Sequence, residues 1–178
     1  MPRLSRSHKV AIAAGGGFLA LLGVLSAVLA PSGSPAGAGA SPGVAANRFT
    51  LPALGHQGHE VSLSQFAGRP VLINFFSSDC AACKRETPEL ASLYRAHHGQ
   101  VAVVGIDVSD STGAALSMIH QYGVSFPVGA DPMAETASAY GVTALPQTFF
   151  LDAAHRIVQR TFGALSAAVL NTGLSRMH

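Results

Sequence analysis

The only two cysteines of this 178-residue chain are Cys80 and Cys83, and two alanines separate them. An apolar, β-rich run at residues 71–76 precedes the pair, and a segment with helical periodicity follows it. A Cys-x-x-Cys motif at a strand-to-helix junction is the arrangement of a dithiol redox site. The chemistry that this motif predicts is thiol–disulfide exchange.

The expected position of Cys80 at the start of the helix favours it as the attacking cysteine. A thiol reacts as its thiolate, and the backbone N–H groups and the positive dipole end at a helix start favour the negative form. Lys84 and Arg85 add positive charge nearby, whereas Asp79 opposes them. Cys83 lies about one helical turn further on the same face and should be less exposed. We therefore expect Cys80 to attack a substrate disulfide and Cys83 to resolve the mixed disulfide.

Glu86 is the third candidate catalytic residue. It follows Cys83 by three residues, and Leu90 follows Cys83 by seven, so Glu86 should lie on the inward-facing stripe beside the thiols. A partly buried carboxylate there could exchange protons with Cys83. A solvated glutamate near a helix start, favoured by the helix dipole, explains the same spacing. The spacing alone leaves both interpretations open.

Leu145 and Pro146 form a candidate substrate-binding segment, directly ahead of an apolar run at residues 148–151. A proline that leads into a strand is either an ordinary trans proline or a cis proline, and trans is the default on frequency. A cis bond would leave the Leu145 backbone free to pair with an extended substrate.

The periodicity of the chain predicts the elements that position these residues. Strands are expected at 49–52, 60–63, 71–76, 101–107, 126–128, 148–152 and 156–160, and helices at 80–97, 112–122, 133–140 and 166–174. Pro88 should kink the first helix because it lacks a backbone donor. The order β-β-β-α-β-α-β-α-β-β-α predicts an α/β fold with helices packed on a mixed sheet that is parallel in its middle.

The N-terminal part has a different composition, because no charged residue occurs between Lys9 and Arg48. As a helix, the apolar run at residues 10–30 would be about 31 Å long, close to the thickness of a bilayer core. The charge pattern places the following domain outside the cytoplasm. The expected organisation is a basic cytoplasmic segment at 1–9, a transmembrane anchor or cleaved signal peptide at 10–30, a flexible linker at 31–46 and a folded domain at 47–178.

The folded region is close to electrically neutral. From Asn47 onward, eight basic residues stand against nine acidic ones. An interface with nucleic acid requires a basic patch, so no nucleic acid partner is expected.

Three stretches of the chain, PVLINFFSSDCAACKRETPEL, VVGIDV and TALPQTFFLD, resemble the thioredoxin superfamily in this order. The nearer resemblance is to its membrane-tethered branch, the TlpA/ResA/CcmG-like thiol–disulfide oxidoreductases, which are related to the redoxin and AhpC/TSA proteins. The resemblance covers roughly Asn47 to the C-terminus. It implies a thioredoxin fold with an added N-terminal hairpin and a central αβ insertion.

The resemblance also implies roles for the site residues. Cys80 matches the nucleophile, Cys83 the resolving cysteine and Glu86 the active-site glutamate. Pro146 matches the cis-proline that faces the dithiol, and with Leu145 it would line the substrate site. The implied partners are protein thiols and disulfides, such as apocytochrome c in cytochrome c maturation, and a membrane electron donor or acceptor. No bound cofactor is implied, because the electrons travel through the dithiol.

The chain departs from the family pattern around the motif. Asp79 stands where the family usually has Trp, and the dipeptide Ala81-Ala82 replaces proline-containing pairs. Asn74 stands where thioredoxin itself has a buried acid, and asparagine is usual for this branch. The redox potential and the mode of substrate docking are therefore not carried over from the family.

Other readings of the cysteine pair remain as alternatives. In a peroxiredoxin-like peroxidase, the peroxidatic cysteine is the last residue of a Pro-x-x-x-Thr/Ser-x-x-Cys pattern. If Cys80 is that cysteine, Ser77 fits the Thr/Ser position, but Ile73 stands at the proline position and does not fit. A zinc site would need further ligands, because Cys83 with His97 supplies only part of a zinc-finger spacing. A copper-delivery protein would need a longer spacing between its cysteines and a distant His. A purely structural disulfide between adjacent helical turns would constrain little chain. No metal site is expected.

Overall fold

The computed structural model describes residues 42–97 and 99–178. The basic segment and the anchor or signal peptide, expected at 1–9 and 10–30, lie outside the described residues, as does most of the linker. Within the described part, none of the helices is both long enough and apolar enough to cross a bilayer.

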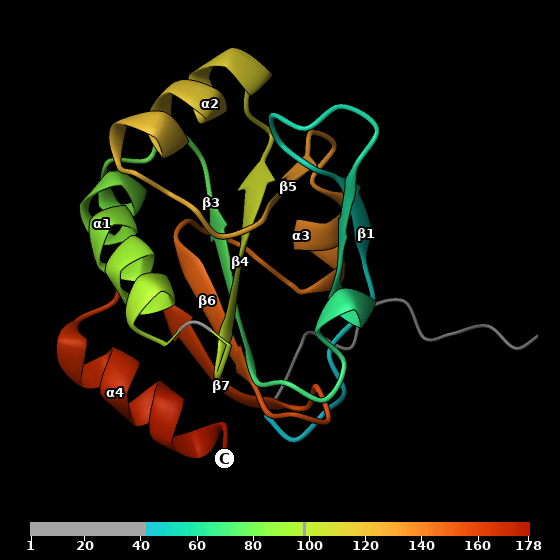
Figure 1. Ribbon diagram of the computed structural model, residues 1–178, viewed down its shortest axis with the longest axis vertical. Helices are drawn as coiled ribbons and strands as arrows, with labels where there is room; N and C mark the ends of the chain where they lie inside the picture. The colour runs from blue at the N-terminus through green and yellow to red at the C-terminus, as the bar shows by residue number, and fades with distance from the viewer. Residues whose placement is uncertain (1–41, 98) are drawn as a thin grey trace, which may run out of the picture. The chain divides into compact units, whose positions relative to one another are not determined.

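The described elements follow the predicted order, with one additional short helix, η1 (Figure 1). They are β1 (Thr50–Pro52), β2 (Glu60–Ser62), the 3-10 helix η1 (Leu63–Phe66), β3 (Val71–Phe76), α1 (Ala81–Ala96), β4 (Ala102–Val108), α2 (Thr112–Gln121), β5 (Val128–Asp131), α3 (Glu135–Ala139), β6 (Gln147–Leu151), β7 (Ile157–Phe162) and α4 (Ala167–Arg176).

Two details of the predicted elements were wrong. The strand expected at 126–128 lies later, as β5, because Pro127 has no N–H to contribute to a strand ladder. The helix η1 was missed because its signal is local, namely the Gln65 side chain that accepts the Ser62 backbone N–H at 3.0 Å. Helix α1 runs through Pro88 without interruption.

The main sheet has five strands in the order β5-β4-β3-β6-β7, and β1 and β2 form a separate antiparallel hairpin. Strands β3, β4 and β5 are parallel to one another, whereas β6 and β7 are antiparallel to their neighbours. The predicted mixed sheet is confirmed, but its parallel part is one half of the sheet rather than the middle. Helix α2 and strand β5 follow β4 in the chain, and β5 adds an edge strand to the parallel half of the sheet. They form an αβ unit in the middle of the domain, where the family resemblance implied an insertion.

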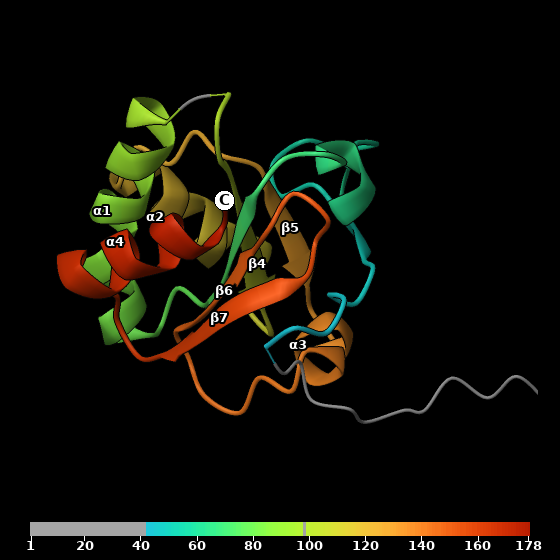
Figure 2. The same ribbon diagram turned by 90° about the horizontal axis from the view of Figure 1, so that it is seen from below.

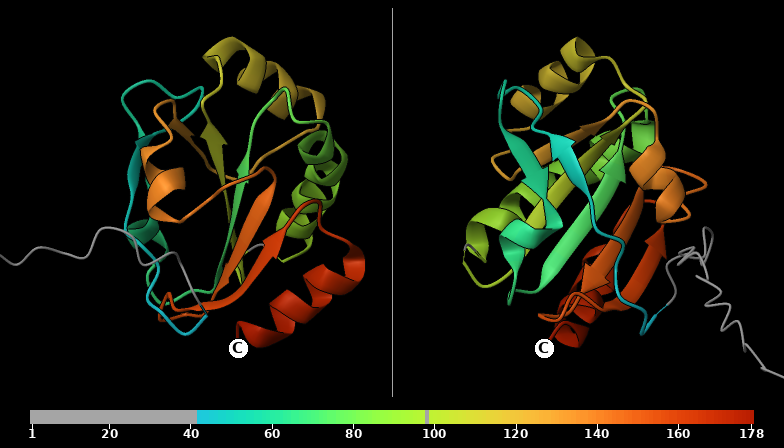
Figure 3. Two further views of the ribbon diagram at one scale, coloured as in Figure 1. Left: turned by 180° about the vertical axis from the view of Figure 1, so that it is seen from behind. Right: turned by 90° about the vertical axis from the view of Figure 1, so that its right-hand side faces the viewer.

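Helices cover both faces of this sheet, as Figures 2 and 3 show. Helices α1, α2 and α4 lie on one face, and α3 with the β1–β2 hairpin lies on the other. The side chains of β3 alternate accordingly. Val71, Ile73 and Phe75 enter the core beneath α3 and the hairpin, and Leu72 and Phe76 enter the core beneath α1. By the same alternation, Asn74 faces α1.

Candidate active site

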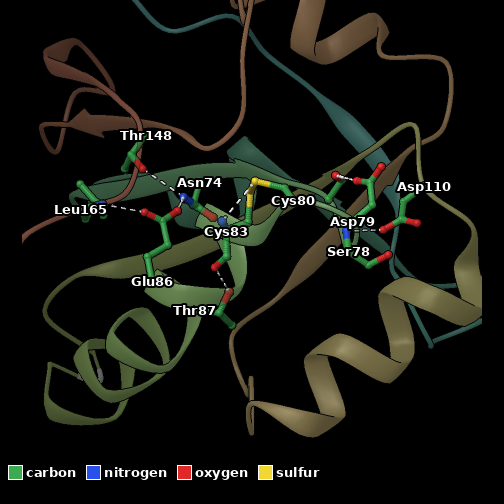
Figure 4. The surroundings of a disulfide bond; sticks show 11 residues. Asn74, Ser78, Asp79, Cys80, Cys83, Glu86, Thr87, Asp110, Thr148 and Leu165 are labelled. Atoms are coloured by element: carbon green, nitrogen blue, oxygen red, sulfur yellow. Dashed lines mark hydrogen bonds between the residues drawn. A yellow bond between two sulfur atoms is a disulfide. The ribbon is translucent and has the colours of Figure 1, made fainter.

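The two cysteines form a disulfide at the start of α1, directly after the central strand β3 (Figure 4). Cys80 is the N-cap residue of this helix and is partly exposed, whereas Cys83 is completely buried. The backbone N–H of Cys83 donates a hydrogen bond to the Cys80 sulfur at 3.1 Å. The more accessible sulfur therefore lies among the free N–H groups of a helix start, where a negative charge is stabilised.

Glu86 is buried, with 2% of its surface exposed, so the solvated interpretation of this residue was wrong. Its two carboxylate oxygens accept hydrogen bonds from Asn74 Nδ2 and from the Leu165 backbone N–H, both at 2.7 Å. Burial raises the pKa of Glu86 above its usual 4.5, although both hydrogen bonds favour the charged form. A carboxyl group in this setting can hold or release a proton nearer neutral pH.

Asn74 connects Glu86 to strand β6, because its Nδ2 also donates to Thr148 Oγ1 at 3.0 Å. In Figure 4, Asn74, Glu86 and Thr148 lie on the Cys83 side of the disulfide. Four chain segments, β3, α1, β6 and the start of α4, thus contribute to one buried polar cluster. Its members are far apart in sequence, and the bonded residues Glu86 and Leu165 are 79 positions apart.

The Leu145–Pro146 peptide bond is cis, as the family resemblance implied and against the default from frequency. Pro146 is buried and Leu145 is half-buried. Strand β6 starts one residue later with Gln147, which pairs with Phe75 near the end of β3. Because the antiparallel strands β3 and β6 are neighbours, the end of β3 and the start of β6 bring the dithiol loop and Pro146 to the same end of the sheet.

Two acidic residues that the sequence analysis did not single out, Asp107 and Asp110, lie at the end of β4, beside the end of β3. Asp107 is near the end of β4 and is 3% exposed, and its Oδ1 has no hydrogen-bond partner. Burial, reinforced by the adjacent Asp110, raises the pKa of Asp107 to about 7. An aspartate inside the otherwise apolar run VAVVGIDV was the available signal.

Asp110 connects the end of β4 to the loop that carries Cys80. One oxygen of its carboxylate accepts the Ser78 backbone N–H at 2.5 Å, and the other accepts the Ser111 N–H at 2.7 Å. Burial works against ionisation of Asp110, but hydrogen bonds outweigh it and lower the pKa of this carboxyl. In the same loop, Ser77 Oγ donates to the Asp79 carboxylate.

The zinc-finger reading that paired Cys83 with His97 is excluded by helix geometry. His97 caps the far end of α1, and the 14 steps along the chain from Cys83 to His97 correspond to about 21 Å of helix. No single ion can contact both side chains. Among the described residues, no cluster of three or more His, Cys, Asp or Glu side chains has the arrangement of a metal site.

A mixed sheet, a Cys-x-x-Cys at the start of the helix after its central strand and a cis-proline at the same end define a thioredoxin-fold dithiol protein. The chain belongs to the AhpC/TSA family, whose profile matches residues 42–160. The predicted fold class and the predicted resemblance to the thioredoxin superfamily are confirmed.

Individual relatives narrow this assignment. The chain is 31% identical over 115 residues to the thiol-disulfide oxidoreductase ResA of Bacillus subtilis, an alignment that covers 64% of each chain. It is 39% identical over 95 residues to a thiol:disulfide interchange protein DsbE homolog of Paracoccus denitrificans, covering 53% of this chain and 51% of the relative. The matches thus span between half and two-thirds of these relatives' lengths.

The fold is also similar to a solved structure described as a thiol:disulfide interchange protein DsbE from Chlorobium tepidum. The TM-score is 0.70 at 25% sequence identity, and the match covers 78% of this chain and 99% of that one. The oxidoreductase class predicted from the cysteine pair agrees with these relatives.

Proposed function

We propose that this protein is a thiol–disulfide oxidoreductase that exchanges its Cys80–Cys83 couple with protein thiols and disulfides. The observation that carries the proposal is the asymmetry of the disulfide, in which a partly exposed sulfur at a helix N-terminus is bonded to a completely buried one. Such asymmetry supports attack by Cys80 and resolution by Cys83, because only the outer sulfur is open to a protein substrate.

The exchange then balances as follows. In the reduced protein, the Cys80 thiolate attacks one sulfur of a substrate disulfide, which forms a mixed disulfide and releases the first substrate thiolate. The Cys83 thiolate attacks the Cys80 sulfur, which closes the internal disulfide and releases the second substrate thiolate. Two electrons pass from the protein to the substrate, and the released thiolates take up protons. The reverse sequence oxidises a substrate dithiol, so no bound cofactor is required.

Glu86 acts in this scheme as the proton acceptor for the Cys83 thiol. Its place three residues after Cys83, its burial and its raised pKa support this role. Leu145 and Pro146 act as the substrate-binding segment, which the family resemblance and their place at the dithiol end of the sheet support.

We also propose that the protein is anchored in the cell membrane with its folded domain outside the cytoplasm. The apolar run at residues 10–30, preceded by three basic residues, would anchor the chain and place the domain at 47–178 outside the cytoplasm. The names of the relatives, a thiol-disulfide oxidoreductase and a thiol:disulfide interchange protein, support thiols and disulfides as substrates. The family resemblance adds apocytochrome c as one candidate substrate and a membrane protein as electron donor or acceptor.

Equilibration of the full-length protein in graded thiol buffers, followed by alkylation with a mass tag, tests the proposal. We expect a single two-electron couple and exchange with a disulfide-bonded protein. Cys83→Ser should accumulate the mixed disulfide, and Cys80→Ser should form none. A pair that cannot be titrated, or an absence of exchange, would refute the oxidoreductase. Turnover of peroxide faster than disulfide exchange would favour the peroxidase alternative.

A further inference from the structure

The segment that connects α3 to β6, residues 141–147, contains the proposed substrate-binding residues Leu145 and Pro146 but has little backbone structure of its own. Within the described part of the chain, the backbone groups of residues 143–145 take part in no backbone hydrogen bond. A segment with so few internal bonds keeps one conformation only if contacts at its ends hold it. The side chains that bind those ends therefore decide how the segment is presented.

One side chain, that of Arg160 in β7, binds both ends of this segment. Its Nη2 donates a hydrogen bond to the Gly141 carbonyl, just after α3. Arginine carries only donors, so the Gln147 side-chain amide turns its oxygen towards the guanidinium. In that orientation the oxygen accepts hydrogen bonds from Arg160 Nη2 at 2.7 Å and from Nε at 2.6 Å. Gln147 is fully buried, and a two-nitrogen contact with a cation fixes both its distance and its orientation.

The register of the sheet explains why Arg160 reaches both ends. In the antiparallel pair of β6 and β7, Arg160 lies opposite Phe149, and Phe162 lies opposite Gln147. Arg160 is therefore diagonal to Gln147 on the same face of the sheet, within reach of a long side chain. Its guanidinium carbon lies over the rings of Phe149 and Phe162, 5.3 and 4.6 Å from their centroids. These two rings restrict where the guanidinium can lie.

The end of β7 also binds the segment directly. The Gly163 N–H donates to the Pro146 carbonyl at 2.9 Å. Phe162, the residue before Gly163, is 61% exposed although it is a large aromatic side chain. Gln147 pairs with Phe75 of β3 on one side and with Phe162 on the other, so these contacts lie at the same end of the sheet as the dithiol loop.

We propose that Arg160 is the positioning residue of the substrate-binding segment and that it directs the protein towards polypeptide disulfides rather than small ones. With both ends of residues 141–147 bound to one guanidinium, the backbone groups of residues 143–145 are held ready to bond an extended polypeptide. A small disulfide has no backbone to bind there and reacts with the dithiol without the segment. The inference rests on the proposed function in taking Leu145 and Pro146 as substrate-binding residues.

The test compares two disulfides as substrates of the reduced full-length protein: a synthetic peptide with a Cys-x-x-Cys disulfide, and bis(2-hydroxyethyl) disulfide. The readout is the rate constant with the peptide divided by that with the small disulfide, because damage to the dithiol itself lowers both and cancels. Arg160→Met should lower this ratio about tenfold, as expected if the segment keeps its binding conformation about a tenth of the time. An unchanged ratio would overturn the proposal.

Two further variants separate position from charge. Arg160→Lys keeps the positive charge, but one ammonium group cannot reproduce the two-nitrogen contact with Gln147, so this variant should lower the ratio as well. Full activity of Arg160→Lys would mean that charge alone attracts the peptide, against the proposal. Arg156→Met is the matched control, since Arg156 is exposed just before β7 and donates to the Gly43 carbonyl instead. The same fall in this control would also contradict a specific role for Arg160.

Amide hydrogen exchange followed by mass spectrometry gives a readout that needs no disulfide substrate. The backbone N–H groups of Val142 and Gly163 donate hydrogen bonds at the two ends of the segment. Arg160→Met should speed exchange in the fragments that contain them and leave the fragment that covers β3 unchanged. Unchanged exchange at these ends, or faster exchange in every fragment, would overturn the proposal. If the unmodified protein reacts with neither disulfide, the proposed function fails, and hydrogen exchange still decides whether Arg160 holds the segment.

Discussion

At the scale of single residues, the site depends on polar groups that are buried and paired. The Glu86 carboxylate is held by Asn74 and Leu165, and Asn74 is held in turn by Thr148. A carboxylate with fixed partners keeps its position relative to Cys83 on the same helix, which proton transfer requires. Proton transfer also requires a carboxyl group with a suitable pKa. Burial favours this, because it raises the pKa of Glu86 towards the range in which a thiol loses its proton.

Glu86→Gln should slow the resolution of the mixed disulfide by tenfold or more, since general acid–base catalysis typically contributes about 100-fold or more. The measurement is the lifetime of the mixed disulfide in single-turnover quenched-flow experiments across a pH series. Glu89→Gln is the matched control, because Glu89 is exposed on the same helix. Equal lifetimes for Glu86→Gln and the unmodified protein would remove Glu86 from the mechanism.

At the scale of elements, the position of α4 relative to the sheet depends on one glycine. A Cβ atom at Gly173 would lie 2.2 Å from the Phe150 ring of β6. Only glycine allows this close approach. The same helix begins just after Leu165, whose N–H binds Glu86, so the packing of α4 and the polar cluster are mechanically connected.

Gly173→Ala should lower the free energy of unfolding by about 2 kcal/mol, a typical cost of forcing an extra methyl group into a packed core. Gly113→Ala in α2 is the control, since a Cβ there meets nothing within 4 Å. It should raise stability by about 0.5 kcal/mol through helix propensity. Urea unfolding of the three proteins measures both values. A Gly173→Ala protein as stable as the unmodified one would mean that α4 packs less tightly.

At the scale of the whole molecule, the folded region includes residues ahead of Asn47. The Gly43 N–H donates to the Ile157 carbonyl at 2.6 Å, and the Ala46 N–H donates to the His155 carbonyl at 2.9 Å. The Val44 carbonyl accepts the Ile157 N–H at 2.9 Å. These bonds cover the start of the outer edge of β7, which would otherwise be open.

A chain that begins at Asn47 should therefore be less stable than one that begins at Pro42. Loss of three backbone hydrogen bonds predicts a difference of about 1–3 kcal/mol. Chemical denaturation of the two shortened proteins measures it, and their disulfide exchange rates should agree because the dithiol lies at the far end of the sheet. Identical denaturation curves would show that residues 43–46 contribute nothing to the fold.

Much of the site could be predicted from local patterns. The positions of Cys80 and Cys83 relative to a strand and a helix follow from residue spacing, which reports local periodicity directly. The hydrogen bond from the Ser78 N–H to the Asp110 carboxylate could not be predicted. It depends on how the loop after β4 meets the loop after β3, and no periodicity describes the contact of two loops.

The sequence by itself determined the order of the elements, the alternation of core residues along each strand and the dithiol at a helix start. Each of these depends on neighbours within a few residues. The tertiary structure alone decided that Glu86 is buried, because its partner Leu165 lies 79 residues away. It also decided that β3 lies between β4 and β6. The dithiol loop after β3 therefore lies beside Asp110, which follows β4, and at the same end of the sheet as Pro146, which precedes β6. Pairing of distant strands selects these contacts, since many registers satisfy the same apolar pattern.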